Sequence, residues 1–142
     1  MAEYRTTIES SRSPEDAFEY LATFSNAAEW DPGVAAGQAL QAGPPRVGAV
    51  YRLDIPVAGL TSTFDYRVVE LDRPHRVVLR AEHPLARSVD TITVDTGTRG
   101  SLVHYHAVLH PRGVLRLFAP AVARRFRAVG DRAASGLRTA LA

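Results

Sequence analysis

The last thirty residues, 113–142, carry an apolar repeat that fits one side of a long helix. Apolar residues recur at intervals of three and four, and arginines occupy many of the positions between them. The repeat consists of Leu115, Phe118, Val122, Phe126, Val129, Ala133, Leu137 and Leu141. Roughly 28 helical residues at about 1.5 Å each span about 40 Å, which exceeds the width of a small domain. We therefore expect a helix that lies along a curved surface built by the rest of the chain.

Pro120 falls near the start of this repeat. Because proline has no backbone N–H and clashes with the preceding helical turn, the helix either begins near Ala119 or is kinked there. A kink would make the segment before it a movable gate facing residues 57–59 and 84–86.

The residues before this helix read mainly as strands. Residues 3–10 are rich in β-formers, and Ser13 and Pro14 then supply the N-cap and first position of a helix. A second short helix over residues 25–30 is ended by the Asp31-Pro32-Gly33 turn. Further strands are expected over residues 34–41, 49–56, 61–71, 75–82, 87–95 and 101–109. Their short connections predict an antiparallel meander with one apolar face, which the C-terminal helix alone is large enough to cover.

Composition excludes several classes of function. The 142 residues are most simply a single domain, 1–142, with a net charge of +2 at pH 7 that comes entirely from arginine and is too scattered to indicate nucleic-acid binding. The absence of cysteine excludes disulfides, thiolate metal sites and cysteine nucleophiles. No apolar run approaches the roughly 20 residues of a membrane span, and the N-terminus has no signal-peptide core. We expect a cytoplasmic protein without nucleic-acid partners, as a monomer or homodimer.

The chain resembles the START-like (SRPBCC) superfamily in its order of elements, which is one strand, two short helices, about six strands and a long helix. The local cues are residues 13–18 (SPEDAF), 30–33 (WDPG), 69–77 (VELDRPHRV) and Gly113. Closest in character are the bacterial members labelled polyketide cyclase/dehydrase or lipid transport. The resemblance implies an α+β helix-grip fold, in which a curved antiparallel sheet wraps the C-terminal helix and encloses an apolar cavity.

Strand alternation indicates which side chains face this helix. Ligand sites are mostly apolar with a few placed polar groups, and here the phenols of Tyr51, Tyr66 and Tyr105 would be those groups. The candidate ligand-binding residues are Trp30, Tyr51, Leu53, Phe64, Tyr66, Leu79, Ile92, Val103, Tyr105, Phe118, Val122 and Phe126. We expect a cavity lined by at least two of the three tyrosines. The alternatives are a solid core and, for Trp30, a packing role between the short helices and the sheet.

Asp90, Tyr66 and Tyr105 are the candidate catalytic residues. Asp90 shares the strand parity of Ile92, so it is expected to point inward near Tyr105 across a hairpin. A buried carboxylate beside a phenol could act as a general base in aldol or dehydration chemistry. The alternative is an aspartate in water or paired with Arg80. Glu70 shares the parity of Phe64 and Val68, and the same inward orientation is expected of it.

His104 and His106 share one face of a strand, opposite to Tyr105, so they are expected to face solvent rather than to hold a metal. The sequence contains no G-x-S-x-G, G-x-G-x-x-G or P-loop motif, and no cofactor is expected.

Three functions remain compatible with these patterns. The first is binding of a hydrophobic small molecule, lipid-like or polyketide-like, between sheet and helix. The second is a cyclase/dehydratase-type enzyme. The third is an interaction module without a ligand, which would use an outer apolar stripe formed by Val69, Leu71, Val78, Val89 and Val108.

Overall fold

The computed structural model describes residues 1–57 and 59–142 and contains one seven-stranded antiparallel sheet. Its elements are β1 (Ala2–Ser10), α1 (Pro14–Ala22), η1 (Phe24–Asn26), α2 (Ala27–Trp30), β2 (Ala36–Ala39), β3 (Val50–Val57), β4 (Leu60–Asp72), β5 (Arg76–Glu82), β6 (Ala86–Gly97), β7 (Gly100–Pro111), η2 (Gly113–Phe118) and α3 (Ala119–Ala140). The strand order β1-β7-β6-β5-β4-β3-β2 confirms the predicted meander, with β1 added beside β7. The predicted turn at residues 57–59 includes Ala58, which lies outside the described residues.

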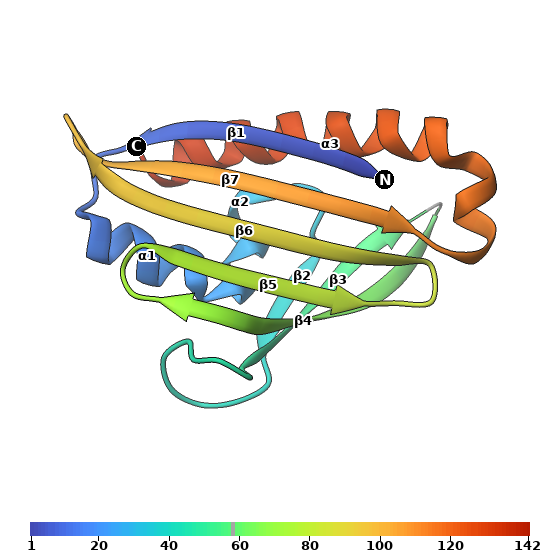
Figure 1. The fold of residues 1–142 in the computed structure, drawn as a ribbon, viewed down its shortest axis with the longest axis horizontal. Helices are drawn as coiled ribbons and strands as arrows, with labels where there is room; N and C mark the ends of the chain where they lie inside the picture. Colours follow the sequence, from blue (N-terminus) through green and yellow to red (C-terminus); the bar gives the residue numbers. More distant parts are fainter. Residues whose placement is uncertain (58) are drawn as a thin grey trace.

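The sheet and α3 enclose the core, and α1 and α2 close one end of it. Figure 1 shows α3 running along β1, and α1 packs against β6 and β7. The α1 cap forms as predicted, because the Ser13 hydroxyl accepts the Asp16 backbone N–H at 3.2 Å and Pro14 occupies the first turn. The arrangement is the helix-grip fold that the element order predicted.

The C-terminal helix is shorter than the repeat predicted. Residues Gly113–Phe118 form the 3₁₀ segment η2, and α3 begins at Ala119. The first of the two alternatives for Pro120 is therefore confirmed, because a proline is well suited to the first turn of a helix, where no N–H is needed. Within α3 only Ala134 and Leu137 are buried, so its C-terminal half packs firmly while its first half does not. No helix in the described ranges combines the length and hydrophobicity that crossing a membrane requires.

A β-bulge in β4 overturns two predictions. The pairing of β4 with β5 shifts between Val68 and Glu70, which reverses the faces of the residues that follow. Glu70 is therefore exposed and pairs with Arg76 at 3.3 Å, instead of pointing inward. Leu71 packs against the core and does not belong to an outer stripe. The outer apolar stripe proposed for an interaction module therefore lacks Leu71.

Candidate functional site

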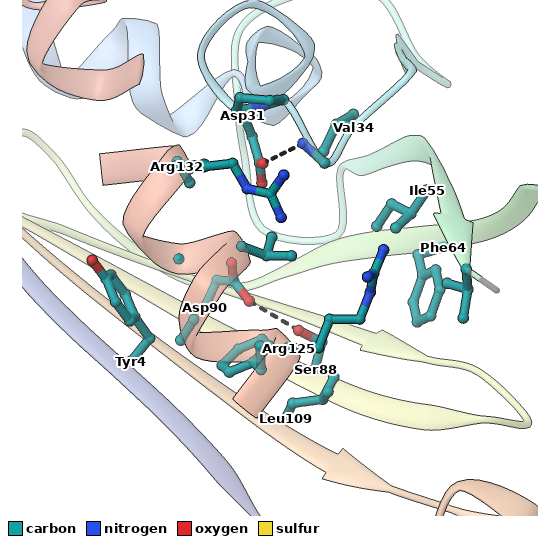
Figure 2. A pocket seen from close by; sticks show the side chains of 18 of the residues that line it. Tyr4, Asp31, Val34, Ile55, Phe64, Ser88, Asp90, Leu109, Arg125 and Arg132 are labelled. Carbon is teal, nitrogen blue, oxygen red and sulfur yellow. Dashed lines mark hydrogen bonds between the residues drawn. The ribbon is translucent and has the colours of Figure 1, made fainter. Parts of the chain in front are cut away.

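A cavity of about 760 Å³ lies between the sheet and α3. This volume falls within the roughly 300–1,000 Å³ typical of small-molecule sites. Its walls come from the end of α2 and the following turn, from β1, β3, β4, β6 and β7, and from α3 (Figure 2). The lining residues that are also exposed are Pro32, Pro56, Gly59, Ala121, Arg125 and Arg132. They place the mouth of the cavity between α3 and the segments around residues 32 and 56–59.

The cavity exists because small side chains face it where larger ones would fill it. Ala107 on β7 and Ala121, Ala133 and Ala134 on α3 all contribute to the lining. Trp30 lines the cavity from the end of α2 and is 3% exposed, and its ring meets Tyr105 edge-on at 5.6 Å between ring centroids. Its indole N–H is buried without a hydrogen-bond partner in the described part of the chain. Trp30 thus combines the packing role with a position in the cavity wall.

Half of the candidate ligand-binding residues line this cavity, and they include two of the three tyrosines, as predicted. These residues are Trp30, Phe64, Tyr66, Tyr105, Val122 and Phe126. Leu115 also lines the cavity, together with Leu85 and Ala86 from the segment predicted to face a gate.

The other six candidates do not line the cavity, contrary to expectation. They are Tyr51, Leu53, Leu79, Ile92, Val103 and Phe118. Alternation predicts the face of a strand correctly, but it does not say which end of that face is covered by packing. The α1 helix contacts β6 and β7, and the first five residues belong to the solid hydrophobic core. Phe118 is 57% exposed because it belongs to η2 and not to the helix.

The polar cluster in the cavity wall consists of Asp90, Ser88, Tyr66 and Tyr105. The Tyr66 hydroxyl donates to Ser88 Oγ at 3.1 Å, and Ser88 donates to Asp90 Oδ1 at 3.1 Å. The Tyr105 hydroxyl donates to Asp90 Oδ2 from across the β6–β7 hairpin. All four side chains are buried, so the predicted convergence of the aspartate and the phenols is present. Ser88 was missed, although it lies two residues from Asp90 and therefore shares its face.

Burial raises the pKa of Asp90 to about 6, against the lowering effect of the hydrogen bonds from Tyr105 and Ser88. Burial and the nearby Asp90 charge raise the pKa of both Tyr66 and Tyr105 above the ordinary range of a phenol. Near neutral pH the cluster therefore holds one carboxylate that can accept a proton and phenols that keep theirs. A base with a pKa close to the working pH is suited to general-base catalysis.

Three charged residues at the cavity were not among the candidates: Asp31, Arg125 and Arg132. Both arginines lie between the apolar positions of the helical repeat. Burial raises the pKa of Asp31, while the hydrogen bond from the Gly33 backbone N–H (2.8 Å) and the charge of Arg132 lower it. Figure 2 shows the Arg132 side chain beside Asp31, and Arg125 extending toward Ile55 and Phe64.

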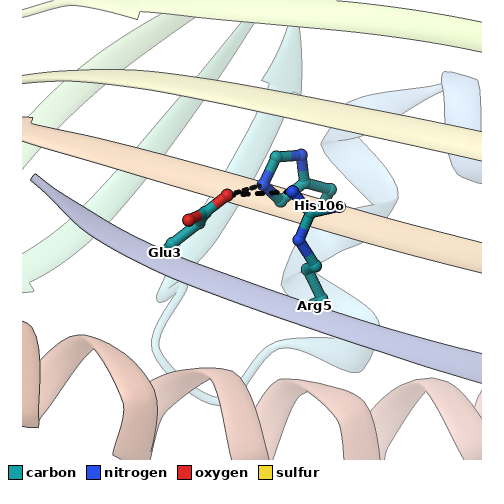
Figure 3. A network of polar contacts seen from close by, with 3 residues as sticks. All are labelled: Glu3, Arg5 and His106. Carbon is teal, nitrogen blue, oxygen red and sulfur yellow. Dashed lines mark hydrogen bonds and ion pairs between the residues drawn. The ribbon is translucent and has the colours of Figure 1, made fainter.

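The histidine pair lies on the outer face of the sheet, as predicted. His106 Nε2 lies 2.7 Å from a Glu3 carboxylate oxygen, and Arg5 contacts the same oxygen at 3.1 Å (Figure 3). His104 Nδ1 lies 3.0 Å from the Thr7 hydroxyl on β1. The contacts of the two histidines join β7 to β1 on the face away from the cavity.

The chain is similar in sequence or structure to several known proteins. The profile of the family described as "Polyketide cyclase / dehydrase and lipid transport" matches residues 1–142. A START superfamily protein from Mycobacterium smegmatis is 15% identical, with a TM-score of 0.78 over 99% of this chain and 97% of that one. Major latex-like protein 151 from Panax ginseng is 10% identical, with a TM-score of 0.66 over 99% and 97%.

A third similar structure is StfQ, the di-domain ARO/CYC from the steffimycin biosynthetic pathway. It is 16% identical, with a TM-score of 0.70 over 99% of this chain and 50% of that one. Among curated proteins, none matches the sequence. The structural likenesses support the fold, and the profile covers the full length of the sequence. The fold is therefore START-like, and the chain belongs to the polyketide cyclase/dehydrase and lipid transport family.

Proposed function

We propose that the protein binds a hydrophobic small molecule, lipid-like or polyketide-like, in the cavity beneath α3. The observation that carries this proposal is the cavity of about 760 Å³, lined mainly by apolar side chains with one polar cluster in its wall. The family description names polyketides and lipids, and it supports the same function. The apolar walls would bind the body of the ligand, and the Asp90 cluster would meet a hydroxyl or carbonyl group on it.

Two measurements test this proposal. Native mass spectrometry of the purified protein should detect a co-purifying apolar molecule. Titration with the neutral fluorescent probe N-phenyl-1-naphthylamine should show saturable binding in the cavity. A protein that shows neither a co-purified molecule nor saturable probe binding would contradict the proposal.

Filling the cavity should abolish probe binding. Val122→Trp places a large ring on a lining position of α3, and we expect the Kd for N-phenyl-1-naphthylamine to rise at least about tenfold. Ala123→Trp is the matched control, since Ala123 is the next residue and does not line the cavity. Equal losses of binding in both variants, or none in either, would argue against binding at this site.

The second candidate function is an enzyme that moves a proton on the bound molecule, as a cyclase or dehydratase would. The observation that favours it is the buried Asp90 carboxylate, which accepts hydrogen bonds from Ser88 and Tyr105 and has a pKa near 6. In the proposed step, Asp90 takes a proton from the carbon beside a ligand carbonyl. The C–H bonding pair then forms an enolate whose charge rests on the carbonyl oxygen.

Hydrogen–deuterium exchange of 2-decanone in D₂O tests this step without knowledge of the natural substrate. We expect the protein to accelerate exchange beside the carbonyl, with a rate that rises as pH passes through about 6, because the ionised Asp90 is the base. Asp90→Asn should remove the acceleration while N-phenyl-1-naphthylamine still binds. An Asp90→Asn variant that exchanges as fast as the wild type would exclude Asp90 as the base.

A further inference from the structure

The two arginines at the mouth of the cavity have no established role in the fold. Arg125 and Arg132 are both exposed residues of α3 that line the cavity, and they lie two helical turns apart on the same side of the helix. Neither forms an ion pair within the described residues, where seven other arginines do. A guanidinium at the mouth of an apolar pocket is a donor suited to carboxylate and phosphate groups.

Negative and positive side chains lie at different depths in the cavity. Asp90 is 6% exposed and lies in the wall, whereas both arginines are at the mouth. Asp31 lies near Arg132, but burial disfavours its charged form and its carboxylate already accepts the Gly33 N–H. Arg125 extends toward Ile55 and Phe64, across the gap between α3 and the β3–β4 strands (Figure 2). An anion would be repelled by Asp90 inside the cavity and attracted by the guanidiniums at its mouth.

The surrounding helix strengthens this attraction. Besides these two, α3 carries Arg124, Arg127 and Arg138, and its single acid, Asp131, accepts a hydrogen bond from the Tyr4 hydroxyl at 2.9 Å. Charges of one sign beside a low-dielectric cleft raise the local concentration of an oppositely charged ligand.

We propose that the ligand is an anionic amphiphile, whose carboxylate or phosphate headgroup binds Arg125 and Arg132 at the mouth while its apolar chain fills the cavity. This inference rests on the proposed binding function and adds the charge and the orientation of the ligand. Arg125 is the principal contact, because Asp31 partly offsets the charge of Arg132.

Displacement of N-phenyl-1-naphthylamine at pH 8 tests the proposal, with decanoate, decyl phosphate and decanol as competitors below their micellar concentrations. The three share one chain and differ in headgroup, so the comparison separates a carboxylate from a phosphate and either from a neutral hydroxyl. We expect at least one of the two anions to displace the probe about tenfold more effectively than decanol does.

The variants Arg125→Gln and Arg132→Gln should weaken displacement of the probe by the anionic competitors. We expect the double variant to reduce that displacement about tenfold or more, with Arg125→Gln accounting for most of the loss. Glutamine keeps part of the apolar stem that lines the cavity, so displacement by decanol should stay unchanged. The double variant Arg124→Gln and Arg127→Gln is the matched control, because it removes the same charge from positions of α3 that do not line the cavity.

Each outcome has a distinct meaning. If the probe does not bind the wild-type protein and no apolar molecule co-purifies with it, the proposed binding function fails. If the probe binds but decanol competes as well as both anions, the function stands and the anionic ligand is excluded. If the control pair weakens the anions as much as Arg125 and Arg132 do, the general charge of α3 is responsible and the headgroup site is overturned. If the arginine variants reduce displacement by decanol as much as displacement by the anions, the arginines act through packing and the headgroup site is likewise overturned.

Discussion

Replacing Asp90 with asparagine is expected to stabilise the protein at pH 8 and to change its stability little at pH 4. Burial raises the pKa of Asp90 from 3.8 to about 6 in the folded chain, so folding favours the protonated carboxyl. The stability contributed by this group is fully present below the unfolded pKa of about 4 and is lost as pH rises through about 6. The difference of about two pKa units corresponds to about 3 kcal/mol at pH 8.

Asparagine removes the charge and keeps an oxygen that can accept the Tyr105 hydroxyl, so it avoids most of this cost. Thermal unfolding at pH 4, 6 and 8 should show a gain in Tm of roughly 5–10 °C at pH 8 that declines to near zero at pH 4. Asp65→Asn is the control, because the hydrogen bond and charge of Arg52 lower the pKa of Asp65, and removing that charge cannot stabilise the protein at pH 8. A destabilised Asp90→Asn variant at pH 8 would show that its hydrogen bonds outweigh the cost of burying its charge.

Replacing Gly136 with alanine should destabilise the protein by at least about 2 kcal/mol, although alanine normally strengthens a helix by about 1 kcal/mol relative to glycine. A Cβ at this position would lie 1.8 Å from the Trp30 carbonyl oxygen, which is a backbone atom that cannot rotate away. Relieving the overlap requires α2 and α3 to separate, and overpacking of this kind costs about 1–3 kcal/mol or more before any propensity gain. Urea unfolding measured as a change in midpoint and slope is the appropriate assay.

Gly130→Ala is the matched comparison on the same helix. There a Cβ would lie 2.5 Å from the Tyr4 ring, which belongs to a half-buried side chain and can move. We expect a smaller loss than at Gly136, with the hydrogen bond between Tyr4 and Asp131 weakened. A Gly136→Ala variant as stable as the wild type would mean that α2 and α3 can separate at little cost.

Much of the fold follows from local patterns. The Ser13-Pro14 pair specifies the start of α1, and the short connections of the strands lead to the meander. Strand alternation also brought Asp90, Tyr66 and Tyr105 to one face, because side chains two residues apart always point the same way along an uninterrupted strand. The candidate acid–phenol site could therefore be predicted from parity alone, and Ser88 could have been added by the same reasoning.

Strand alternation predicts the wrong face for residues that follow a bulge. It also does not predict which residues along a face line the cavity and which are covered by packing. The bulge after Val68 turned Glu70 outward and Leu71 inward, and no residue type in that segment signals it. Ile92 and Tyr105 are paired neighbours on β6 and β7, yet only Tyr105 lines the cavity. Which of them is covered depends on where α1 ends, which is a matter of packing between distant segments.

The C-terminal helix likewise shows which features follow from sequence patterns and which depend on tertiary packing. Its amphipathic repeat established that residues near the end of the chain lie against the sheet, because intervals of three and four place apolar groups on one side of any helix. Only the tertiary structure decided that this side of α3 stands over a cavity, with Ala134 and Leu137 buried in its wall and Arg125 and Arg132 at its mouth. Sequence periodicity determines the direction in which a side chain points. Whether that side chain meets packed atoms or a cavity depends on contacts between residues distant in the sequence, such as Trp30 and Gly136, which meet only in the folded protein.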